Sequence, residues 1–574
     1  MLISNLNLLA KAPGGVARLR ELILTLAVQG KLVPQDAAEE PASVLLLKIR
    51  EEKERLIAAR ALKREKNQPA LTDEQLPFEL PDSWTWVALG EVIDIVRGIT
   101  FSADQKTKEA APGRIACLRT SNVQQTIEWD DLLFVNRSFM GREDQLIQHH
   151  DIVMSMANSR ELVGKVALVE QVPHAEATFG GFLGVLRPRK IEPRYAMAVL
   201  RTSFARSLLI DSSSQTTNIA NISLAKLRPL PFPLPPEAEQ SRIVTRVEEL
   251  MRLCDTLEAK GKLEATQHAQ LVNTLLGTLT VSTTPEELAD NWQRVSQHFD
   301  LLLDRPEAID ALEQTLLQLA VRGLLVPQDA GDEPASTLLA RIRSEKDRLI
   351  AEGKVKRDKP LPPITAEEQP FELPIGWAWV RLGFLGESFD YGSSQKSVDD
   401  SAAVPILRMG NIQGGRVFMN NLKYLKDTRG ELPHLALHEG DLLFNRTNSY
   451  ELVGKTGIFE GYSREVTFAS YLIRIRLMGA WLNPEYINAY MNTLDCRKNE
   501  IEPDLTQQTG QANYNGTKLK SIRVPLPPLA EQSRIVTRIT ALRRLCADLR
   551  QRLKAAQATQ SHLAQALVES SNTL

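Results

Sequence analysis

A stretch of fourteen residues occurs twice in this chain with a single difference. PLPPEAEQSRIVTR spans Pro233–Arg246, and PLPPLAEQSRIVTR spans Pro525–Arg538, at an offset of 292 residues. Four further stretches repeat in the same order, at offsets of 289 to 293: Leu22–Ser43 with Thr315–Ser336, Pro77–Gly90 with Pro370–Gly383, Leu118–Gln124 with Leu407–Gln413, and Asn158–Lys165 with Asn448–Lys455. This nearly constant offset indicates two copies of one long unit and excludes the repeats of roughly 20–50 residues that build solenoids.

The two copies differ unevenly along their length. Their flanks are nearly identical, whereas the interiors, at residues 91–220 and 384–512, match only in short islands. A two-domain enzyme has no obvious need for this pattern. A protein with two equivalent attachment regions and two different recognition regions would have alike flanks and divergent interiors. The duplication therefore predicts that arrangement.

Composition places the chain among soluble globular proteins, with 43% hydrophobic and 24% charged residues in 574. A chain of this length is expected to hold several domains. No apolar run reaches the ~18 residues that a membrane span requires, and Met1–Gly15 lacks the features of a signal peptide. The formal net charge of −2 does not by itself indicate a nucleic-acid partner, because DNA-binding domains usually carry a basic surface.

The sequence contains none of the common catalytic or metal-binding motifs. The four cysteines form no C-x-x-C pair, so we expect reduced, buried thiols and no metal site. Glu451–Gly457 resembles a phosphate-binding loop, but Ser449 stands where that pattern requires glycine. The Pro-Pro-Tyr or Pro-Pro-Phe core of amino-methyltransferases is also missing. We therefore predict no catalytic residue, and a chain that binds and positions other molecules.

Local patterns predict an α+β fold. Apolar residues recur at helical spacing in Leu19–Val28, and Gly30 follows where a helix end is expected. Short strand-like runs, separated by Gly, Asn and Asp, fill the interiors. The expected segments are an N-terminal helical segment (1–76), a first compact domain (77–232), a first long helix (233–280), a central helical segment (281–369), a second compact domain (370–524) and a second long helix (525–574).

Each copy of the fourteen-residue motif is expected to begin a long helix. Proline suits the first helical turn. Glu239 and Gln240, like Glu531 and Gln532, are expected to complement the unpaired N–H groups of the helix start. The first helix is predicted to end near Leu279, and the second is predicted to end near Leu567.

Apolar residues in both helices follow the 4-3-4-3 spacing of a coiled-coil seam. We predict that the two helices pair as a long antiparallel two-helix coiled coil separating two pseudo-symmetric α+β domains. Replacing both Ile243 and Ile535 with Asp should then disrupt this pairing while leaving each domain folded. The predicted seam residues are Ile243, Val247, Leu250, Cys254, Leu257, Ile535, Ile539, Leu542, Cys546 and Leu549.

This layout resembles the specificity subunit of type I restriction-modification enzymes, in the branch of the family with longer chains. The resemblance covers essentially the whole chain. It rests on LP-x-x-W-x-W-V-x-LG at Leu80 and Leu373, LR-x-x-N at Leu118 and Leu407, and the fourteen-residue motif at Pro233 and Pro525.

The resemblance implies that each compact domain is a target-recognition domain for one half of a bipartite double-stranded DNA sequence. It implies that the helices dock two modification subunits, which bind S-adenosylmethionine and methylate adenine. Restriction subunits would hydrolyse ATP with Mg and cut the DNA. The chain itself would bind no cofactor and contact no membrane, and it would act in the cytoplasm.

Candidate DNA contacts come from the polar residues of the islands that both copies share. Base recognition favours Arg, Lys, Asn or Gln on exposed loops. Islands common to both domains suit phosphate contacts or fold roles better than discrimination between bases. The candidates are Arg119, Asn122, Asn158, Arg160, Lys165, Arg408, Asn411, Arg446, Asn448 and Lys455.

Residues that discriminate between bases are expected mainly in the unshared loops. Two further amide- and hydroxyl-rich stretches, Ser212–Ser223 and Thr506–Thr517, are interpreted as loops that either face solvent or contact DNA. The unshared loops are Arg97–Lys108, Arg137–Arg142, Tyr391–Lys396 and Asn420–Arg429.

An alternative function is a pseudo-symmetric coiled-coil scaffold that joins two protein partners without recognising DNA. The near-neutral charge favours this alternative, whereas the divergence of the interiors favours DNA recognition. The target sequence itself does not follow from the residues, because base preference depends on loop geometry rather than loop composition.

Overall fold

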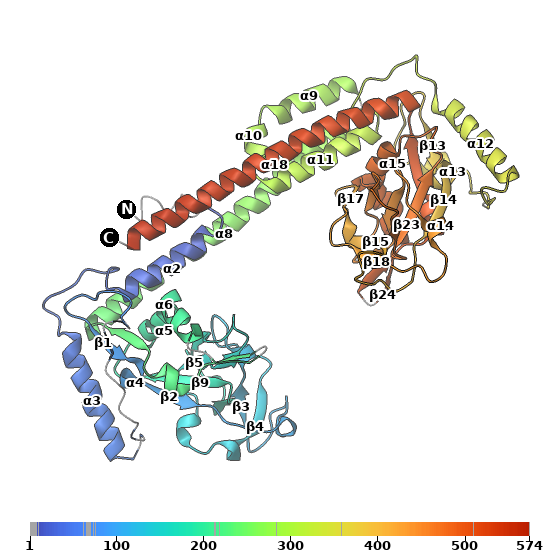
Figure 1. The fold of residues 1–574 in the computed structure, drawn as a ribbon. Helices are drawn as coiled ribbons and strands as arrows, with labels where there is room; N and C mark the ends of the chain where they lie inside the picture. The colour runs from blue at the N-terminus through green and yellow to red at the C-terminus, as the bar shows by residue number, and fades with distance from the viewer. Residues whose placement is uncertain are drawn as a thin grey trace. The chain divides into compact units, whose positions relative to one another are not determined.

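The chain divides into two compact units (Figure 1). The first comprises residues 1–264 and 557–574, and the second comprises residues 265–556. Two long helices, α8 (Glu237–Val281) and α18 (Leu529–Asn572), contribute residues to both units. The computed structural model describes residues 9, 11–60, 62, 64, 71, 72, 74, 76–211, 214–216, 219–282, 284–357, 359–508 and 510–572.

The first unit joins helices to a β-rich domain. Besides part of each long helix, its helices are α2 (Gly15–Val28), α3 (Ala42–Ala58), α4 (Leu89–Val92), α5 (Pro193–Arg201), α6 (Ser203–Asp211) and α7 (Leu224–Leu227). Its strands are β1 (Thr85–Ala88), β2 (Ile93–Arg97), β3 (Arg114–Leu118), β4 (Leu133–Asn136), β5 (Ile152–Ser155), β6 (Ala157–Asn158), β7 (Val166–Leu168), β8 (Ala177–Phe179), β9 (Leu183–Pro188), β10 (Ser214–Thr216), β11 (Ile219–Asn221) and β12 (Pro231–Leu234).

The central sheet of this domain has the strand order β2-β9-β5-β7 and is covered on both faces. Alternate residues of a strand point to opposite faces. Ile152 and Met154 pack in the cluster that contains Tyr195 of α5. Val153, between them, packs instead with Leu118 and Phe179, which belong to the second sheet, β4-β3-β8. The core therefore forms two layers, one on each face of the central sheet.

The second unit repeats this plan. Its further helices are α9 (Pro285–Ser296), α10 (Phe299–Leu302), α11 (Pro306–Val321), α12 (Ala335–Ala351), α13 (Leu382–Leu385), α14 (Leu432–Leu435), α15 (Pro484–Met491), α16 (Leu494–Cys496) and α17 (Gly516–Ser521). Its strands are β13 (Ala378–Arg381), β14 (Gly386–Tyr391), β15 (Val404–Leu407), β16 (Ile412–Gln413), β17 (Arg416–Val417), β18 (Lys423–Leu425), β19 (Leu442–Asn445), β20 (Thr447–Asn448), β21 (Thr456–Ile458), β22 (Thr467–Phe468), β23 (Leu472–Leu477), β24 (Thr506–Gln508), β25 (Gln511–Asn513) and β26 (Arg523–Leu526).

Both layers of the first domain have counterparts in the second. The central sheet has the order β14-β23-β19-β21-β17-β16, and the covering sheet has the order β18-β15-β22. Leu442 and Phe444 face one hydrophobic cluster, whereas Leu443 faces the cluster that contains Leu407 and Phe468. The α+β class predicted from the sequence is confirmed for both copies.

The predicted long helices are present, and a third helix packs against each of them. In the first unit, Leu250, Cys254 and Leu257 of α8 share a cluster with Leu19 of α2 and Ala564 of α18. The prediction of a two-helix coiled coil did not include α2. The apolar periodicity of α2 indicates a helix but does not show which surface that helix packs against.

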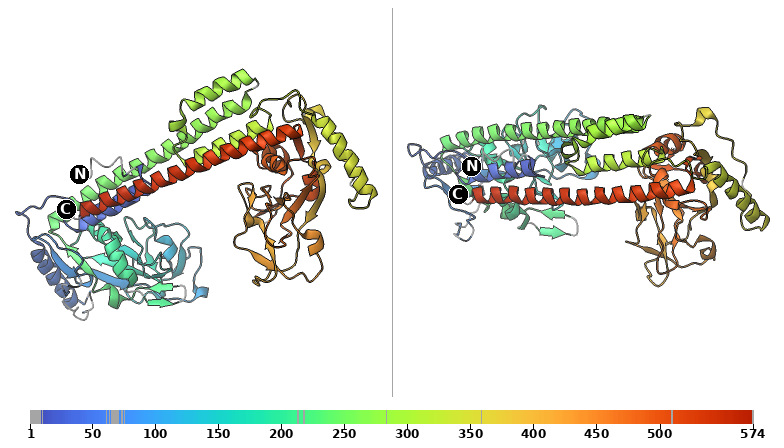
Figure 2. Two further views of the ribbon diagram at one scale, coloured as in Figure 1. Left: turned by 45° about the horizontal axis from the view of Figure 1, so that its top comes forward. Right: turned by 90° about the horizontal axis from the view of Figure 1, so that it is seen from above.

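The corresponding third helix of the second unit is α11. There, Leu542, Cys546 and Leu549 of α18 cluster with Leu316 of α11 and Leu276 of α8. Figure 2 shows α11 running alongside α18. Arg550 of α18 also forms ion pairs with two carboxylates of α11, Asp310 at 2.6 Å and Glu313 at 2.7 Å.

The first predicted seam residue of each helix is not in a coiled-coil seam. Ile243 is fully buried in the core of its own compact domain, together with Tyr195 and Phe232. Ile535 lies in the core of the second domain, and Ile539 lies there as well. Val247 contacts both the domain core and the helical cluster. The first turns of each helix therefore belong to the domain they leave, and replacing Ile243 with Asp is expected to unfold that domain.

The carboxylate of Glu239 joins three segments of the first unit. It accepts a hydrogen bond from the indole Nε1 of Trp84 at 2.9 Å and another from Nε2 of Gln35 at 2.6 Å. Gln35 follows α2, Trp84 precedes β1, and Glu239 lies in the first turn of α8. Burial is the main influence on Glu239, and it raises the pKa of the carboxyl group. Glu239 thus serves as a buried junction, a role beyond the predicted helix-terminus one.

The neighbouring Gln240 extends this junction to the domain. Its Oε1 accepts from the backbone N of Glu192 at 2.9 Å, and its Nε2 donates to the carbonyl of Pro235 at 3.1 Å. Arg242, two residues later, pairs with Glu39 at 2.8 Å. Glu239, Gln240 and Arg242 of the repeated motif therefore contact different segments of the unit.

The second unit contains the same junction. Glu531 accepts from Nε1 of Trp377 at 2.9 Å and from Nε2 of Gln328 at 2.7 Å. Gln532 Oε1 accepts from the backbone N of Asn483 at 2.9 Å, and Arg534 pairs with Asp332 at 2.7 Å. Burial raises the pKa of Glu531 too. These side chains explain why the flanks of the two copies are so alike.

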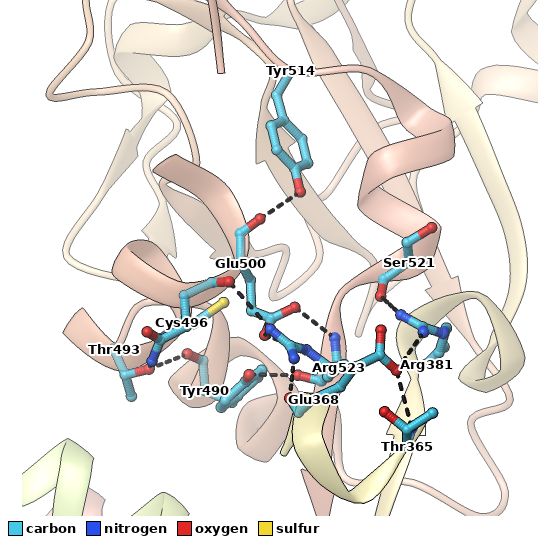
Figure 3. Close-up of polar contacts among 11 residues, drawn as sticks. Thr365, Glu368, Arg381, Tyr490, Thr493, Cys496, Glu500, Tyr514, Ser521 and Arg523 are labelled. Carbon is cyan, nitrogen blue, oxygen red and sulfur yellow. Dashed lines mark hydrogen bonds and ion pairs between the residues drawn. The ribbon is translucent and has the colours of Figure 1, made fainter. Parts of the chain in front are cut away.

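Among the described residues, one buried polar network occurs in the second unit and has no counterpart in the first. The carboxylate of Glu500 accepts from the backbone N and from Nε of Arg523, at 2.9 and 2.8 Å (Figure 3). The hydroxyl of Tyr514 donates to the Glu500 carbonyl at 2.9 Å, and the hydroxyl of Tyr490 donates to the Arg523 carbonyl. The first copy has Leu209 and Pro231 in place of this pair, so the same position is filled by apolar packing there.

Candidate nucleic-acid interface

Backbone hydrogen bonds bring four distant segments of the first domain together. The turn between β8 and β9 accepts from the loop after β2, through Ile99 N and the carbonyl of Phe179 at 2.9 Å. The same turn accepts from β5–β6, through Met156 N and the carbonyl of Phe182 at 2.8 Å. The carbonyl of Met156 in turn accepts from Ile222 N, at the end of the β10–β11 hairpin, at 2.8 Å.

The second domain builds the same frame. Ser393 N donates to the carbonyl of Phe468 at 2.9 Å, and Arg446 N donates to the carbonyl of Tyr471 at 3.0 Å. Tyr514 N then donates to the carbonyl of Arg446 at 2.8 Å. We call the surface formed by these four segments, in either domain, the recognition face.

A glycine permits the close approach of two of these segments. A Cβ atom on Gly98 would lie 2.2 Å from the carbonyl oxygen of Gly180. A Cβ atom on Gly392 would lie 2.3 Å from the carbonyl oxygen of Phe468. Any side chain at these positions would push the loop away from the turn, so both copies require glycine here.

The unshared loops predicted to discriminate between bases reach the recognition face. In the first domain, Gln145 donates to the carbonyl of Arg97 at 3.1 Å, and the rings of Phe101 and Phe139 are 6.3 Å apart. In the second domain, Gln395 donates to Asp427 at 3.2 Å. The two loops predicted for each domain therefore contact one another.

The two amide- and hydroxyl-rich stretches contain β-hairpins, which corrects their interpretation as loops. In the first domain β10 pairs with β11, and β11 pairs with β6. In the second domain β24 pairs with β25, and β25 pairs with β20. Their residues have weak strand propensity. Each hairpin adds to the rest of its domain because β11 pairs with β6 and β25 pairs with β20. Residues 212, 213, 217, 218 and 509 of these stretches lie outside the described part of the chain.

Two predicted DNA contacts are buried structural residues. Asn122 is 3% exposed, and its Oδ1 accepts from the backbone N of Arg119 at 2.9 Å. Its Nδ2 donates to two carbonyls, of Glu128 and Asp130, at 3.0 Å each. Asn411 makes the equivalent contacts in the second domain. The asparagine of the LR-x-x-N motif is therefore a turn-forming residue in both domains.

The arginine of the same motif also supports the turn. Arg119 donates to the side chain of Asp131 at 2.8 Å, and Arg408 donates to the carbonyl of Asn421 at 3.0 Å. Asp131 and Asn421 have positive φ angles of 48° and 47°, a conformation that few residues other than glycine adopt. Each arginine thus holds a strained turn at the same place in its domain.

The remaining candidates lie on or beside the recognition face. Asn158 and Asn448 are half-buried, and the Oδ1 of each accepts from the following serine N, at 2.9 and 2.8 Å. Lys165 donates to Gln124 at 2.5 Å. The exposed candidates are Arg160 and Lys455.

Arg446 is the candidate whose surroundings best suit a DNA contact. Its guanidinium lies over the ring of Tyr391, 4.9 Å from the centroid. Such a pair presents a cation and an aromatic edge together on one surface. Tyr391, which is exposed, begins the predicted loop Tyr391–Lys396. Tyr471 is an exposed residue that sequence reasoning did not select. Its alignment with Phe182, another aromatic residue inside a divergent segment, is the signal that could have indicated it.

The described residues lack two other kinds of site. No group of three or more His, Cys, Asp or Glu side chains is placed to hold a metal ion. Within the same residues, no helix combines the length and hydropathy needed to cross a membrane. All four cysteines are buried and unpaired.

The two domains share one architecture and form a duplicated recognition module. Each has an exposed polar and aromatic face, and each is attached through its junction to a long helix, which we call its mount. The family model for the type I restriction modification DNA specificity domain matches the chain twice, at residues 81–267 and 374–556. The chain therefore belongs to this family, and it is a DNA-specificity subunit of a type I restriction-modification complex.

Curated relatives cover nearly the whole chain. The EcoEI specificity subunit of Escherichia coli is 35% identical, over 97% of this chain and 93% of the relative. The EcoAI specificity subunit, also of Escherichia coli, is 34% identical over the same shares. The crystal structure of the HsdS subunit from Thermoanaerobacter tengcongensis is 18% identical, with a TM-score of 0.37, and the match covers 86% of this chain and 97% of that one.

Proposed function

We propose that each domain recognises one half of a bipartite double-stranded DNA sequence. The observation that carries this proposal is the contrast between the junctions and the recognition faces. Glu239 and Glu531 make the same contacts, as identical mounts require. The recognition faces share a backbone frame but differ in side chains, as two different half-sites require.

The long helices and the helices packed on them form the docking surface for two modification subunits. Because the two mounts carry the same residues, they suit two copies of one partner. The modification subunits bind S-adenosylmethionine and methylate adenine in the target. Restriction subunits, with ATP and Mg, join the same complex and cut DNA.

This chain itself contributes binding and positioning, and no catalytic step. Its carboxylates with raised pKa, such as Glu239, are fully committed to structural hydrogen bonds. The complex acts in the cytoplasm, where its DNA target is.

The test uses the chain co-purified with its modification subunits and a pool of double-stranded DNA of random sequence. We expect repeated selection to enrich one split sequence, two short constant segments separated by a spacer of constant length. Enrichment of nothing, with the complex intact, would instead support the scaffold that joins two protein partners without recognising DNA. Enrichment of one uninterrupted segment would show that only one domain recognises DNA.

Methylation provides the second measurement. The purified complex, with S-adenosylmethionine, should methylate adenine in the selected sequence, whereas this chain alone should not. Methylation by the chain alone would contradict the assignment of chemistry to the partner subunits.

A further inference from the structure

Both domains expose an aromatic ring at the same turn. Phe182 is 68% exposed and Tyr471 is 44% exposed. The turn is anchored on each side by buried residues, Phe179 and Leu183 in the first domain and their equivalents in the second. A large apolar side chain held in solvent by a rigid turn, twice in one chain, indicates a surface that a partner covers.

The positions around this ring can be matched between the domains by backbone register. Arg97 pairs with Gly184 on β9, and Tyr391 pairs with Ile473 on β23, so Arg97 and Tyr391 occupy the same place. Each is followed directly by the glycine that touches the turn. The match does not depend on similarity of the side chains.

Two more positions are matched in the same way. Met156 and Arg446 each donate a backbone N–H to the carbonyl of the exposed aromatic residue. Arg160 and Tyr450 each follow a serine whose carbonyl accepts from the residue three further on, at 3.0 and 3.1 Å.

These three matched positions hold different chemistry in the two domains. The first domain has two exposed cations, Arg97 and Arg160, and a buried Met156. The second domain has the ring of Tyr391 under the guanidinium of Arg446, at 4.9 Å.

Tyr450 completes the set in the second domain. Its ring lies under the guanidinium of Arg497, at 5.5 Å. At matched backbone positions, one domain therefore has an arginine where the other has a tyrosine. Arginine offers a bidentate contact to guanine, whereas a tyrosine ring offers apolar contact and one hydroxyl.

We infer that the exposed ring, Phe182 or Tyr471, contacts DNA bases, and that the three matched positions beside it set the half-site each domain prefers. This inference rests on the proposed function, since it names the residues through which each domain recognises its half-site. The ring provides contact that tolerates different sequences, because every base has an apolar face and edge. The flanking side chains provide hydrogen bonds that distinguish bases.

The test compares variants of the full complex on the random DNA pool and on the sequence that the wild type selects. R446M installs the residue that the first domain has at the matched backbone position, and an unchanged thermal unfolding midpoint would show that the second domain accepts it. We expect R446M to change the preferred bases in one half-site and leave the other half-site unchanged. Y450R should do the same at a neighbouring base pair.

The ring is tested separately by affinity. Y471A should weaken binding of the selected sequence about 5- to 150-fold, the range for losing one base contact. Y471F should bind within about twofold of the wild type, because it keeps the ring. The matched control is Y462A, which removes another exposed tyrosine, 46% exposed, beyond the opposite end of β21 from the recognition face.

The outcomes separate this inference from the function on which it rests. If the wild-type complex enriches no split sequence, both fail. If it enriches one and R446M selects the same bases, or Y471A binds as well as Y462A, the inference alone is wrong. Equal thermal unfolding midpoints for Y471A and wild type would show that a loss of affinity does not come from unfolding.

Discussion

The two junctions and the two recognition faces differ in what they keep constant. At the junctions, the side chains themselves are constant: Glu239 and Glu531 each accept from a tryptophan and a glutamine at nearly equal distances. At the recognition faces the backbone hydrogen bonds and the two glycines are constant, whereas the side chains at Arg97 and Tyr391, Met156 and Arg446, and Arg160 and Tyr450 differ. A buried polar junction tolerates no substitution without leaving an unpaired group, whereas an exposed surface on a rigid frame does.

This difference explains why the sequence divergence is localised. Substitutions at the junction would disturb the mount, the compact domain and the helical segment at once, because all three meet at one carboxylate. Substitutions at the recognition face change only which molecule binds. One chain can therefore keep two equivalent mounts while its two domains acquire different preferences.

The largest expected effect comes from placing a charge where the long helix enters the domain core. I243D should destabilise the first domain by about 3–5 kcal/mol, because a buried carboxylate there has no partner. Thermal unfolding followed by limited proteolysis would locate the loss in residues 77–232. L253D is the matched control, since Leu253 lies on the same helix and is partly exposed. Equal losses in both variants would show that the effect comes from adding a charge to the helix and not from the burial of Ile243.

A smaller effect is expected from breaking one junction hydrogen bond. W84F keeps most of the buried ring but removes the N–H that donates to Glu239, and it should cost about 1–3 kcal/mol. W377F should cost the same in the second unit, since Trp377 donates to Glu531. Denaturant unfolding of both variants measures this. Unequal losses would show that the two junctions, despite equal geometry, do not contribute equally.

The LR-x-x-N motif provides a prediction that separates structural from DNA-binding residues. N122A should reduce stability by about 1–3 kcal/mol, because two carbonyls and one N–H lose their buried partner. R160A should leave the unfolding midpoint within about 0.5 kcal/mol of the wild type, as an exposed substitution does. If R160A instead lowers stability and N122A lowers only DNA affinity, the two assignments must be exchanged.

The smallest effect concerns pH. Burial raises the pKa of Glu239 and Glu531 above their unfolded values. Such groups stabilise the fold most below the unfolded pKa, and that contribution is lost as pH rises through the folded pKa. The double variant E239Q/E531Q removes these groups, so the fall in stability between pH 4 and pH 8 should be less steep than in the wild type. Parallel pH profiles for the two proteins would contradict this.

Several features of the fold followed from local sequence pattern. The helices at Glu237–Val281 and Leu529–Asn572 were predicted because a 3.6-residue period acts within one element. Their ends were predicted within a few residues. The partner of each apolar face was not predictable, because a 4-3 spacing is the same whether a domain core, α2 or another long helix covers it.

The candidate site was predicted in part. Arg446 and Arg160 lie at the recognition face, as expected for DNA contacts. Asn122 and Asn411 do not, because an asparagine that closes a buried turn and one that contacts a base look alike in sequence. The hairpins were missed because their polar residues favour loops. Their strands pair with each other and, through β11 and β25, with β6 and β20, which are far away in the sequence.

The sequence by itself determined that the chain contains two copies of one unit, where the long helices begin, and which flanks had to stay alike. These are properties of residue order, and comparison within one chain reveals them. The tertiary structure alone decided which backbone segments meet the turns that carry Phe182 and Tyr471, and therefore that Arg97, Met156 and Arg160 match Tyr391, Arg446 and Tyr450. Those segments are tens of residues apart in the chain and are joined mainly by backbone hydrogen bonds. Such bonds place few demands on side chains, so they leave little pattern in the sequence.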